Sequence, residues 1–420
     1  MSPFLAAIFL HGLCLANAVN LTTVYEWDKF DFVWPSGTDT SIGQIEQNFN
    51  PKQVELQYMA VFGERLYLSM ILRPGIPATL VWMPKRGTST TPPKLAPFPS
   101  WNLHKKDNCD SIQWANGLET DTDGRLWVID QGSNNCPSKI WIFNLLNNDK
   151  TERVHQFPPL VVSHSDSERL LLDIVLDETP DDSLAYIADL LSEHIIVYSR
   201  KTDKSWTITT PWMRWYSLAL SPNREARQLY LGRYGWNETY SVSVSELKNQ
   251  GGSAAVKFIG NWAEHNLYRM VIDSANVMYA AFTNQNYLSK WNVSQPFREQ
   301  RFHEVGILNS GWPFTFALDT SGNFWMTQRN STGGETKHKL RTGTLRPALE
   351  TSGGCANLAE DYRKSQSLVT IMIWLLVFFV VLSCSVIVWL TLRMRRMQTS
   401  FRQIPMENKG EMNVLLETKH

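Results

Sequence analysis

One pattern recurs six times along this 420-residue chain. Each copy consists of an apolar strand, a turn, and a second strand with an aromatic residue at its centre, and "NGLETDTDGRLWVID" (116–130) is the clearest. Its Asp-Gly pair favours a turn because glycine adopts a positive φ without steric penalty. The six copies cover residues 56–70, 116–130, 171–189, 216–233, 268–282 and 314–328. Their central aromatic residues are Tyr67, Trp127, Tyr186, Tyr230, Tyr279 and Trp325.

The spacing of the copies predicts the fold. Successive central aromatics are 44 to 60 residues apart by subtraction, which suits one four-stranded antiparallel sheet per copy. All-strand repeats of this length, without an amphipathic helix, are typical of β-propellers, and six copies predict six blades. The alternative is a row of separate sandwiches, but no Pro/Ser-rich linkers divide the units. We therefore predict an all-β, six-bladed propeller over residues 19–350, and expect part of Thr23–Trp34 to pair into the last blade and close the ring.

Both ends of the chain carry membrane-related signals. Residues 1–18 combine an apolar core with a small-x-small ending, which predicts a cleaved signal peptide. Residues 368–392 form an uncharged apolar run long enough to cross a hydrocarbon core of ~30 Å, giving one C-terminal transmembrane helix. "RMRRM" follows it, which places that side in the cytosol. The chain is thus predicted to be a type I single-pass membrane protein of the secretory pathway with an extracellular or lumenal propeller. A stalk at 351–367 and a cytoplasmic tail at 393–420 would flank the span. Shedding or secretion of the propeller stays open.

Cysteines and sequons agree with an exported domain. Cys109 and Cys136 are the favoured disulfide, and Cys355 is either free or displaces one of them. Four Asn-x-Ser/Thr triplets predict N-glycosylation. They begin at Asn20, Asn237, Asn292 and Asn330.

Composition and motifs exclude several function classes. Lys+Arg and Asp+Glu both total 40, so no net positive field favours nucleic acid. The chain lacks H-E-x-x-H, C-x-x-C, G-x-S-x-G and a P-loop, and its histidines show no metal-ligand spacing. We expect no resident metal or cofactor.

The start of each blade's innermost strand supplies the candidate site. Alignment of the six copies on their turns gives one residue per blade at the mouth of the central channel. These residues are Tyr58, Asn116, Asp173, Ser217, Arg269 and Thr315, with Tyr216, Tyr268 and Phe314 as possible walls. The mixture predicts a clamp for a small aromatic amine or catechol, in which Asp173 pairs with the ammonium and rings stack on the ligand. The alternative is that these residues only fill the channel and hydrogen-bond within it.

The order of the motifs resembles the yellow/major royal jelly protein family of insects across the whole predicted propeller. The matching stretches are "WDKFDFVWPS", "RPGIPATL", "LAPFPSW", "RLWVIDQG", "CPSKIWIFNL", "AYIADLLSEHIIVYS" and "WPFTFALDTSGNFW". The resemblance implies a six-bladed propeller and a role in cuticle melanisation, with biogenic-amine binding in some members and dopachrome conversion in others. Two positions depart from the family pattern: Asp123 stands where members often have Cys, and Arg329 where an amine-contacting Asn is usual.

Four functions stay open at this point. The first is a membrane-tethered binding protein for a catechol- or indole-amine in a pigmentation pathway. The second is an enzyme of the dopachrome-tautomerase type, with Asp173 as base and Arg269 or Tyr58 as electrostatic partner. The third is a calcium-dependent, lactonase-like hydrolase, to which Asn116 and Asp173 would contribute oxygen ligands. The fourth is an adhesion or signalling ectodomain.

Overall fold

The computed structural model describes residues 21–35, 45–86, 91–210, 212–222, 225–283, 285, 287–304, 315–332, 335–345 and 389. The chain divides after Arg346 into two compact units, and the strands belong to the first. Several predicted features lie outside the described residues: the signal peptide expected at 1–18, the stalk at 351–367, the span at 368–392 (except Trp389) and the tail at 393–420. Asn20, Phe314 and Cys355 lie outside them as well. Among the residues described, no helix combines the length and apolarity needed to cross a membrane.

Six four-stranded antiparallel sheets make up the first unit, which confirms the predicted propeller. Blade 1 comprises β2 (Leu56–Phe62), β3 (Arg65–Met70), β4 (Leu80–Pro84) and β5 (Ala96–Pro97). Blade 2 comprises β6 (Ala115–Thr120), β7 (Arg125–Asp130), β8 (Lys139–Asn144) and β9 (Lys150–Gln156). Blade 3 comprises β10 (Leu171–Glu178), β11 (Ser183–Asp189), β12 (His194–Ser199) and β13 (Lys204–Thr209).

The second half of the ring repeats this order. Blade 4 comprises β14 (Trp215–Leu220), β15 (Gln228–Arg233), β16 (Glu238–Ser243) and β17 (Lys257–Asn261). Blade 5 comprises β18 (Leu267–Ile272), β19 (Val277–Phe282), β20 (Tyr287–Asn292) and β21 (Gln300–Glu304). Blade 6 comprises β22 (Phe316–Leu318), β23 (Asn323–Thr332), β24 (Glu335–Thr344) and β1 (Thr22–Trp27). Short helical turns lie at Pro51–Gln53, Trp101–Leu103, Asp166–Glu168 and Val244–Leu247 (α3).

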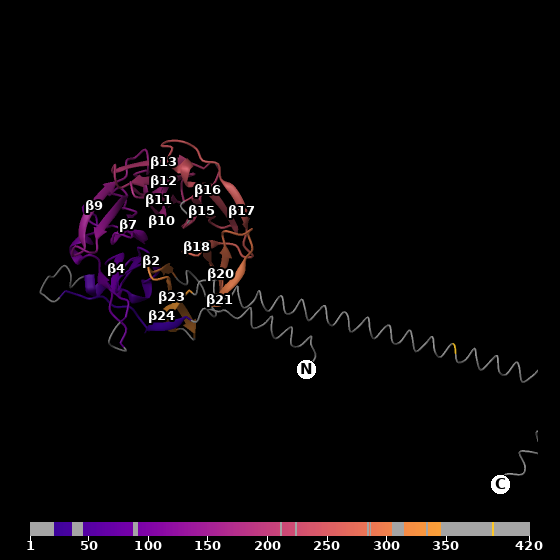
Figure 1. Ribbon diagram of the computed structural model, residues 1–420. Helices are drawn as coiled ribbons and strands as arrows, with labels where there is room; N and C mark the ends of the chain where they lie inside the picture. The colour runs from indigo at the N-terminus through magenta and orange to yellow at the C-terminus, as the bar shows by residue number, and fades with distance from the viewer. Residues whose placement is uncertain are drawn as a thin grey trace, which may run out of the picture. The chain divides into compact units, whose positions relative to one another are not determined.

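The first strand of each blade lies nearest the middle of the ring. Figure 1 shows β2, β10 and β18 around the centre and β9, β13 and β17 at the periphery. Successive inner strands pack against one another in the order β22, β2, β6, β10, β14 and β18. Residues at the same level of these six strands therefore face a common central channel.

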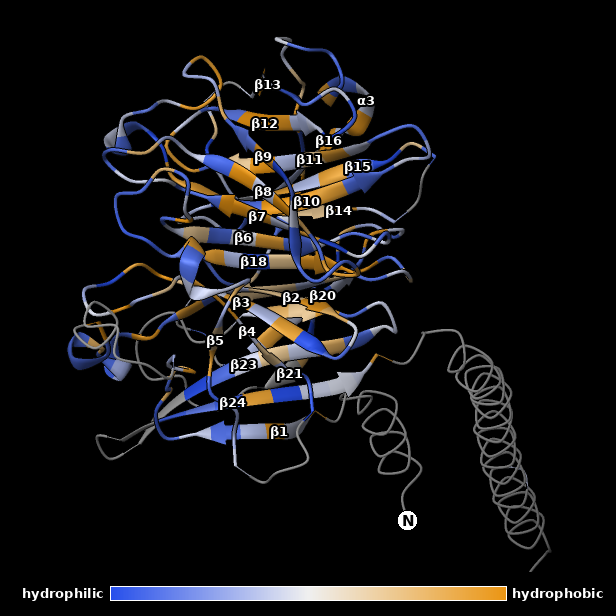
Figure 2. Ribbon diagram, turned by 90° about the vertical axis from the view of Figure 1, so that its left-hand side faces the viewer, coloured by the Kyte–Doolittle hydropathy of each residue, from blue (hydrophilic) through white to orange (hydrophobic). Residues whose placement is uncertain are grey.

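The ring closes as the sequence predicts. β1, from the start of the described chain, forms the outer edge of blade 6 by pairing with β24, so that Tyr25 lies opposite Leu340 and Trp27 opposite His338. Figure 2 shows β1 beside β24 at one side of the ring. The guanidinium Nη2 of Arg341 also donates to the Leu21 carbonyl at 2.6 Å. This pairing joins the two ends of the propeller within one sheet.

The recurring acidic turn has a structural function. In blade 2, Asp121 Oδ2 accepts a 2.8 Å hydrogen bond from the indole of Trp127, and Gly124 completes the turn at φ 80°. Three other blades repeat the contact at 3.0 Å. The repeated pairs are Asp177 with Tyr186, Asp273 with Tyr279, and Asp319 with Trp325. Because the aromatic residue is buried, its polar atom needs a partner, and the turn aspartate provides one.

The central aromatics fill the spaces between blades. Trp127 is fully buried against Leu171 and Ile174 of blade 3, and Trp325 packs in a cluster with residues of blade 1. Truncating such a side chain to Ala typically costs about 3–5 kcal/mol. Blade-to-blade packing by these anchors therefore fixes the ring that places the inner strands around the channel.

Candidate functional site

Each of the five inner strands from β2 to β18 begins with a β-bulge. The pairing register shifts between Leu56 and Tyr58 in β2, and the same irregularity recurs near the start of the other four. The shifts fall at Ala115/Leu118, Leu171/Ile174, Trp215/Ser217 and Leu267/Arg269. Bulges re-aim side chains and are frequent beside binding sites. Five of the six sequence-predicted candidates lie in these bulges or at their ends, and Thr315 directly precedes β22.

All six predicted channel residues are buried. Their exposed fractions do not exceed 3%. Contacts join four of the six, namely Tyr58, Asp173, Ser217 and Arg269. Asn116 instead donates from Nδ2 to the Leu171 carbonyl at 2.6 Å, and the Thr315 amide donates to the Thr327 hydroxyl at 3.0 Å.

An ion pair crosses the channel. Arg269 lies near the start of blade 5 and Asp173 near the start of blade 3, yet the Arg269 guanidinium donates through Nη1 to the Asp173 carboxylate. The same guanidinium lies 5.1 Å from the ring centroid of Tyr58 in blade 1, a cation–π distance. Arg269 therefore connects three blades that are not neighbours in the ring.

The Asp173 carboxylate is fully engaged by the protein. Oδ1 accepts hydrogen bonds from Arg269 and from the Ile174 amide at 3.0 Å. Oδ2 accepts from the Ser217 hydroxyl at 3.0 Å and the Leu218 amide at 2.9 Å. A ligand ammonium or a substrate proton would have to displace one of these donors. In the structure, the Asp173 carboxylate holds the Arg269 guanidinium. Its binding and catalytic roles stay predictions from the sequence.

Electrostatics keep Arg269 charged. Burial alone would lower the pKa of this guanidinium, but the Asp173 carboxylate and smaller contributions from Tyr58 and Glu119 offset burial, so the pKa is raised. The Asp173–Arg269 pair is accordingly a neutral unit built from two opposite charges.

Tyrosines form one wall of the site. Tyr216 and Tyr268 are each 3% exposed, and their ring centroids lie 6.1 Å apart. Tyr234, which the sequence analysis did not select, stacks on Tyr216 at 5.1 Å and is 48% exposed. Burial raises the pKa of both Tyr216 and Tyr268, so both hydroxyls stay protonated near neutral pH. The aromatic series runs from the protein surface towards Arg269.

Several buried polar atoms near the channel have no partner in the described part of the protein. Two are acceptors: the side-chain oxygens of Gln57 and Asn116, in residues that are 7% and 0% exposed. Arg269 Nε is an unpartnered donor, and the Thr315 hydroxyl can donate or accept. Buried polar groups are normally hydrogen-bonded. The channel therefore offers a ligand both acceptors and donors.

Glu119 lies within electrostatic range of the Asp173–Arg269 pair, and the sequence analysis missed it. It lies opposite Trp127 on β6, and at the equivalent place the other five blades carry Ala60, Val175, Ala219, Val271 and Ala317. Burial raises the pKa of its carboxyl to about 7, and Arg269 only partly opposes this rise. Aligning the repeats on their central aromatics instead of their turns would have revealed an acid where the other blades have Ala or Val.

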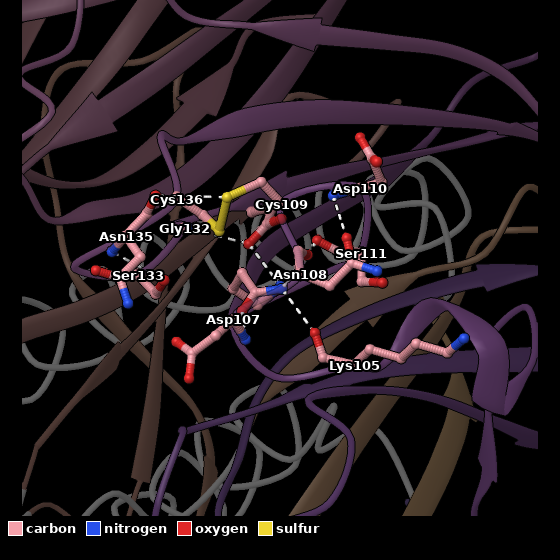
Figure 3. Close-up of a disulfide and its surroundings, with 12 residues drawn as sticks. Lys105, Asp107, Asn108, Cys109, Asp110, Ser111, Gly132, Ser133, Asn135 and Cys136 are labelled. Atoms are coloured by element: carbon pink, nitrogen blue, oxygen red, sulfur yellow. Dashed lines mark hydrogen bonds between the residues drawn. A yellow bond between two sulfur atoms is a disulfide. The ribbon is translucent and has the colours of Figure 1, made fainter.

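The disulfide closes the base of the β6–β7 hairpin. Cys109 and Cys136 are bonded at 2.06 Å, which joins the loop before β6 to the loop after β7 (Figure 3). Arg169 holds the second loop, since its buried guanidinium donates to the carbonyls of Gln131, Ser133 and Cys136 at 2.8–3.1 Å. The two constraints fix the strand that carries Asn116 and Glu119.

The sequons differ in their surroundings. Asn292 is exposed, and its side-chain oxygen accepts a 2.9 Å bond from the Ser294 amide. Asn237 uses Nδ2, the glycosylated atom, to donate to the Trp262 carbonyl at 2.8 Å, and Thr239 of the same sequon is buried. Asn330 lies in β23, and Asn20 lies outside the described residues.

Metal binding has no geometric support in the part of the chain that the structure describes. There, no three His, Cys, Asp or Glu side chains gather closely enough to hold an ion. The calcium site considered from sequence would need the Asp173 carboxylate, whose oxygens are already engaged.

Comparison with known proteins decides the family. The Major royal jelly protein family model matches residues 115–216 and 212–326, just over half of the chain. The chain belongs to this family. It is 26% identical to Protein yellow of Drosophila guanche over 358 residues, covering 74% of this chain and 61% of that protein. It is likewise 26% identical to Protein yellow of Drosophila yakuba over 361 residues, covering 74% and 64%. The chain thus spans about three-fifths of the length of these relatives.

Among solved structures, the yellow-type propeller is similar to an α-L-arabinofuranosidase from Fusarium graminearum, with a TM-score of 0.48 at 10% identity, covering 77% of this chain and 98% of that chain. A luciferin-regenerating enzyme gives a TM-score of 0.44 at 11% identity, covering 71% and 92%. Neither likeness bears on what this chain does.

Proposed function

We propose that this member of the major royal jelly protein family binds a small catechol- or indole-amine in its central channel and acts in pigment formation. The observation that carries the proposal is the combination of a tyrosine wall, made by Tyr216, Tyr268 and Tyr234, with unpartnered acceptors at the starts of the inner strands. An arylalkylamine would supply both complements, since its ring would pack against the tyrosine wall and its ammonium carries three hydrogen-bond donors.

The membrane-anchored location belongs to the same proposal. A disulfide between Cys109 and Cys136 is stable in oxidising compartments such as the secretory lumen and the cell exterior. A cleaved signal at 1–18 and a span at 368–392 would present the propeller there. The propeller would then bind the amine outside the cytosol.

Binding is tested by calorimetry on the full-length chain with dopamine and serotonin. We expect saturable binding of at least one amine, and at least tenfold weaker binding by Tyr216→Leu with a melting temperature close to that of the wild type. Phe258→Ala is the matched control, because Phe258 is an aromatic residue on an outer strand and is 51% exposed. Absence of heat with both amines up to millimolar concentration would reject the proposal.

A second candidate function is dopachrome conversion, favoured by one observation. The Glu119 carboxyl, with a pKa of about 7, lies in the field of the Arg269 guanidinium. A general acid–base group works best with a pKa near the working pH, so Glu119 would move the proton while Arg269 stabilises the developing oxyanion. Dopachrome decay that is no faster with protein than with buffer would reject the enzyme.

A further inference from the structure

The channel contains one acidic position that breaks the sixfold repeat. Glu119 occupies the place on the inner strand where the other five blades have Ala or Val, opposite the central aromatic. It is only partly exposed, and a carboxylate is rarely placed in such a position without a partner. Packing does not require a carboxylate there, because Ala serves in three of the six blades.

Glu119 has no ion-pair partner of its own among the residues described. Its Oε1 accepts a 3.1 Å hydrogen bond from the Thr120 amide, the next residue in the chain. The charged groups that act on it are Arg269, Asp173 and Glu178. Of these, Arg269 is bonded to Asp173, and Glu178 accepts from the Thr122 amide. Glu119, Asp173 and Arg269 together therefore carry a charge of −1 when Glu119 is ionised and zero when it is protonated.

The neighbouring unpartnered atoms favour the same kind of ligand. Asn116 is the second residue of the strand that carries Glu119, and its buried side-chain oxygen has no donor in the described structure. Glu119 lies three residues further along the same strand. An arylethylamine carries donors at both of its ends, a ring hydroxyl and an ammonium.

We propose that Glu119 is the counter-charge that makes this channel selective for ligands with a positively charged amino group over neutral ligands of the same shape. This inference rests on the proposed amine-binding function and assigns the ionic part of recognition to Glu119, because Asp173 is occupied by Arg269. Catechols and indoles that lack the amino group would meet only the aromatic wall and the neutral polar groups.

The assignment has a consequence for pH. An alkylammonium with a pKa near that of Lys stays charged between pH 6 and 8. Burial places the pKa of Glu119 at about 7 in the free protein, so the fraction ionised rises from roughly one-tenth at pH 6 to nine-tenths at pH 8. If the ionised form alone binds a cation tightly, affinity increases about tenfold over this interval.

The test compares dopamine with 4-ethylcatechol, which keeps the ring and lacks the amine, by calorimetry on the full-length chain at pH 6 and pH 8. We expect Glu119→Gln to weaken dopamine binding at least tenfold at pH 8, to change 4-ethylcatechol binding less than twofold, and to abolish the pH dependence for dopamine. Glu119→Ala, the residue that three other blades carry, should behave in the same way. Glu152→Gln, which removes a carboxylate on the outer strand of blade 2, is the matched control and should bind as the wild type does.

The outcomes distinguish a failure of the role assigned to Glu119 from a failure of amine binding itself. If the Glu119 variants bind dopamine as tightly as the wild type, or lose both ligands equally while keeping their melting temperature, the role of Glu119 is overturned and amine binding stands. If the wild type binds neither ligand at either pH, amine binding itself is rejected, and the inference with it.

Discussion

Replacing Asp173 by Ala tests whether the cross-channel ion pair supports the fold. The substitution removes a carboxylate that accepts four hydrogen bonds, from Arg269, Ile174, Ser217 and Leu218. Its largest effect is to leave the buried Arg269 guanidinium without a counter-charge. Breaking a buried ion pair in this way costs about 3–5 kcal/mol of folding free energy.

A double variant that removes both charges separates loss of the ion pair from the cost of a buried, unpaired Arg269. In Asp173→Ala/Arg269→Met neither charge is buried, and the flexible Met side chain follows much of the path of Arg269. Apolar replacement of a buried pair is often close to neutral, so the double variant should be more stable than Asp173→Ala by about 2 kcal/mol or more. Contacting residues commonly show coupling energies of about 0.5–3 kcal/mol in such a cycle.

Urea unfolding of the full-length chain, followed by tryptophan fluorescence, measures these differences. Glu152→Ala is the control, because its ion pair with Arg200 is partly exposed and such pairs contribute about 0–1 kcal/mol. A loss below about 1 kcal/mol for Asp173→Ala would refute the bracing role of the ion pair. So would a double variant less stable than Asp173→Ala itself.

Three further predictions concern other parts of the chain. Cys109→Ser/Cys136→Ser should lower the free energy of unfolding by about 3–4 kcal/mol, because the disulfide closes a loop with a sequence separation of 27 in the unfolded chain. A lower thermal midpoint will show this loss. Mass spectrometry of protein from a glycosylating host should find a glycan at Asn292 and none at Asn237, whose Nδ2 is hydrogen-bonded to Trp262; equal occupancy would contradict this. Burial holds the pKa of His338, beside Phe30 at the ring closure, at about 4. As pH falls, His338 therefore binds a proton in the unfolded chain before it does so in the folded protein. The free energy of unfolding should decline by roughly 3 kcal/mol between pH 6.5 and 4 because of this group. His338→Phe should flatten that part of the stability–pH curve.

The blade count and the closure could be predicted because their signals are local. Turn chemistry and the central aromatic of each copy mark a strand pair wherever they occur, so six copies predict six sheets. Thr23–Trp34 is predicted as the closing strand by position alone, and β1 covers its first residues. The same turn signal also explains why Asp121 is structural, since it bonds Trp127 and Arg125 of its own hairpin.

The candidate site was only partly accessible from sequence. Aligning the copies located the starts of the inner strands, and four of the six residues so chosen do meet. Which residues meet depends on the reach of a side chain across the ring, and Arg269 and Asp173 are 96 positions apart in the chain. No local pattern reveals that Asp173 has all its acceptors filled, or that Tyr234 stacks on Tyr216.

The sequence by itself therefore determined the architecture: six blades, the strand that closes them, and the level at which the channel begins. These follow from periodicity and turn residues, which act over a few positions of the chain. Only the tertiary structure decided the chemistry of the channel. It assigned the Asp173 charge to Arg269 and, among the residues described, left Glu119 without an ion-pair partner. Burial and pairing are properties of the closed ring that no single blade possesses.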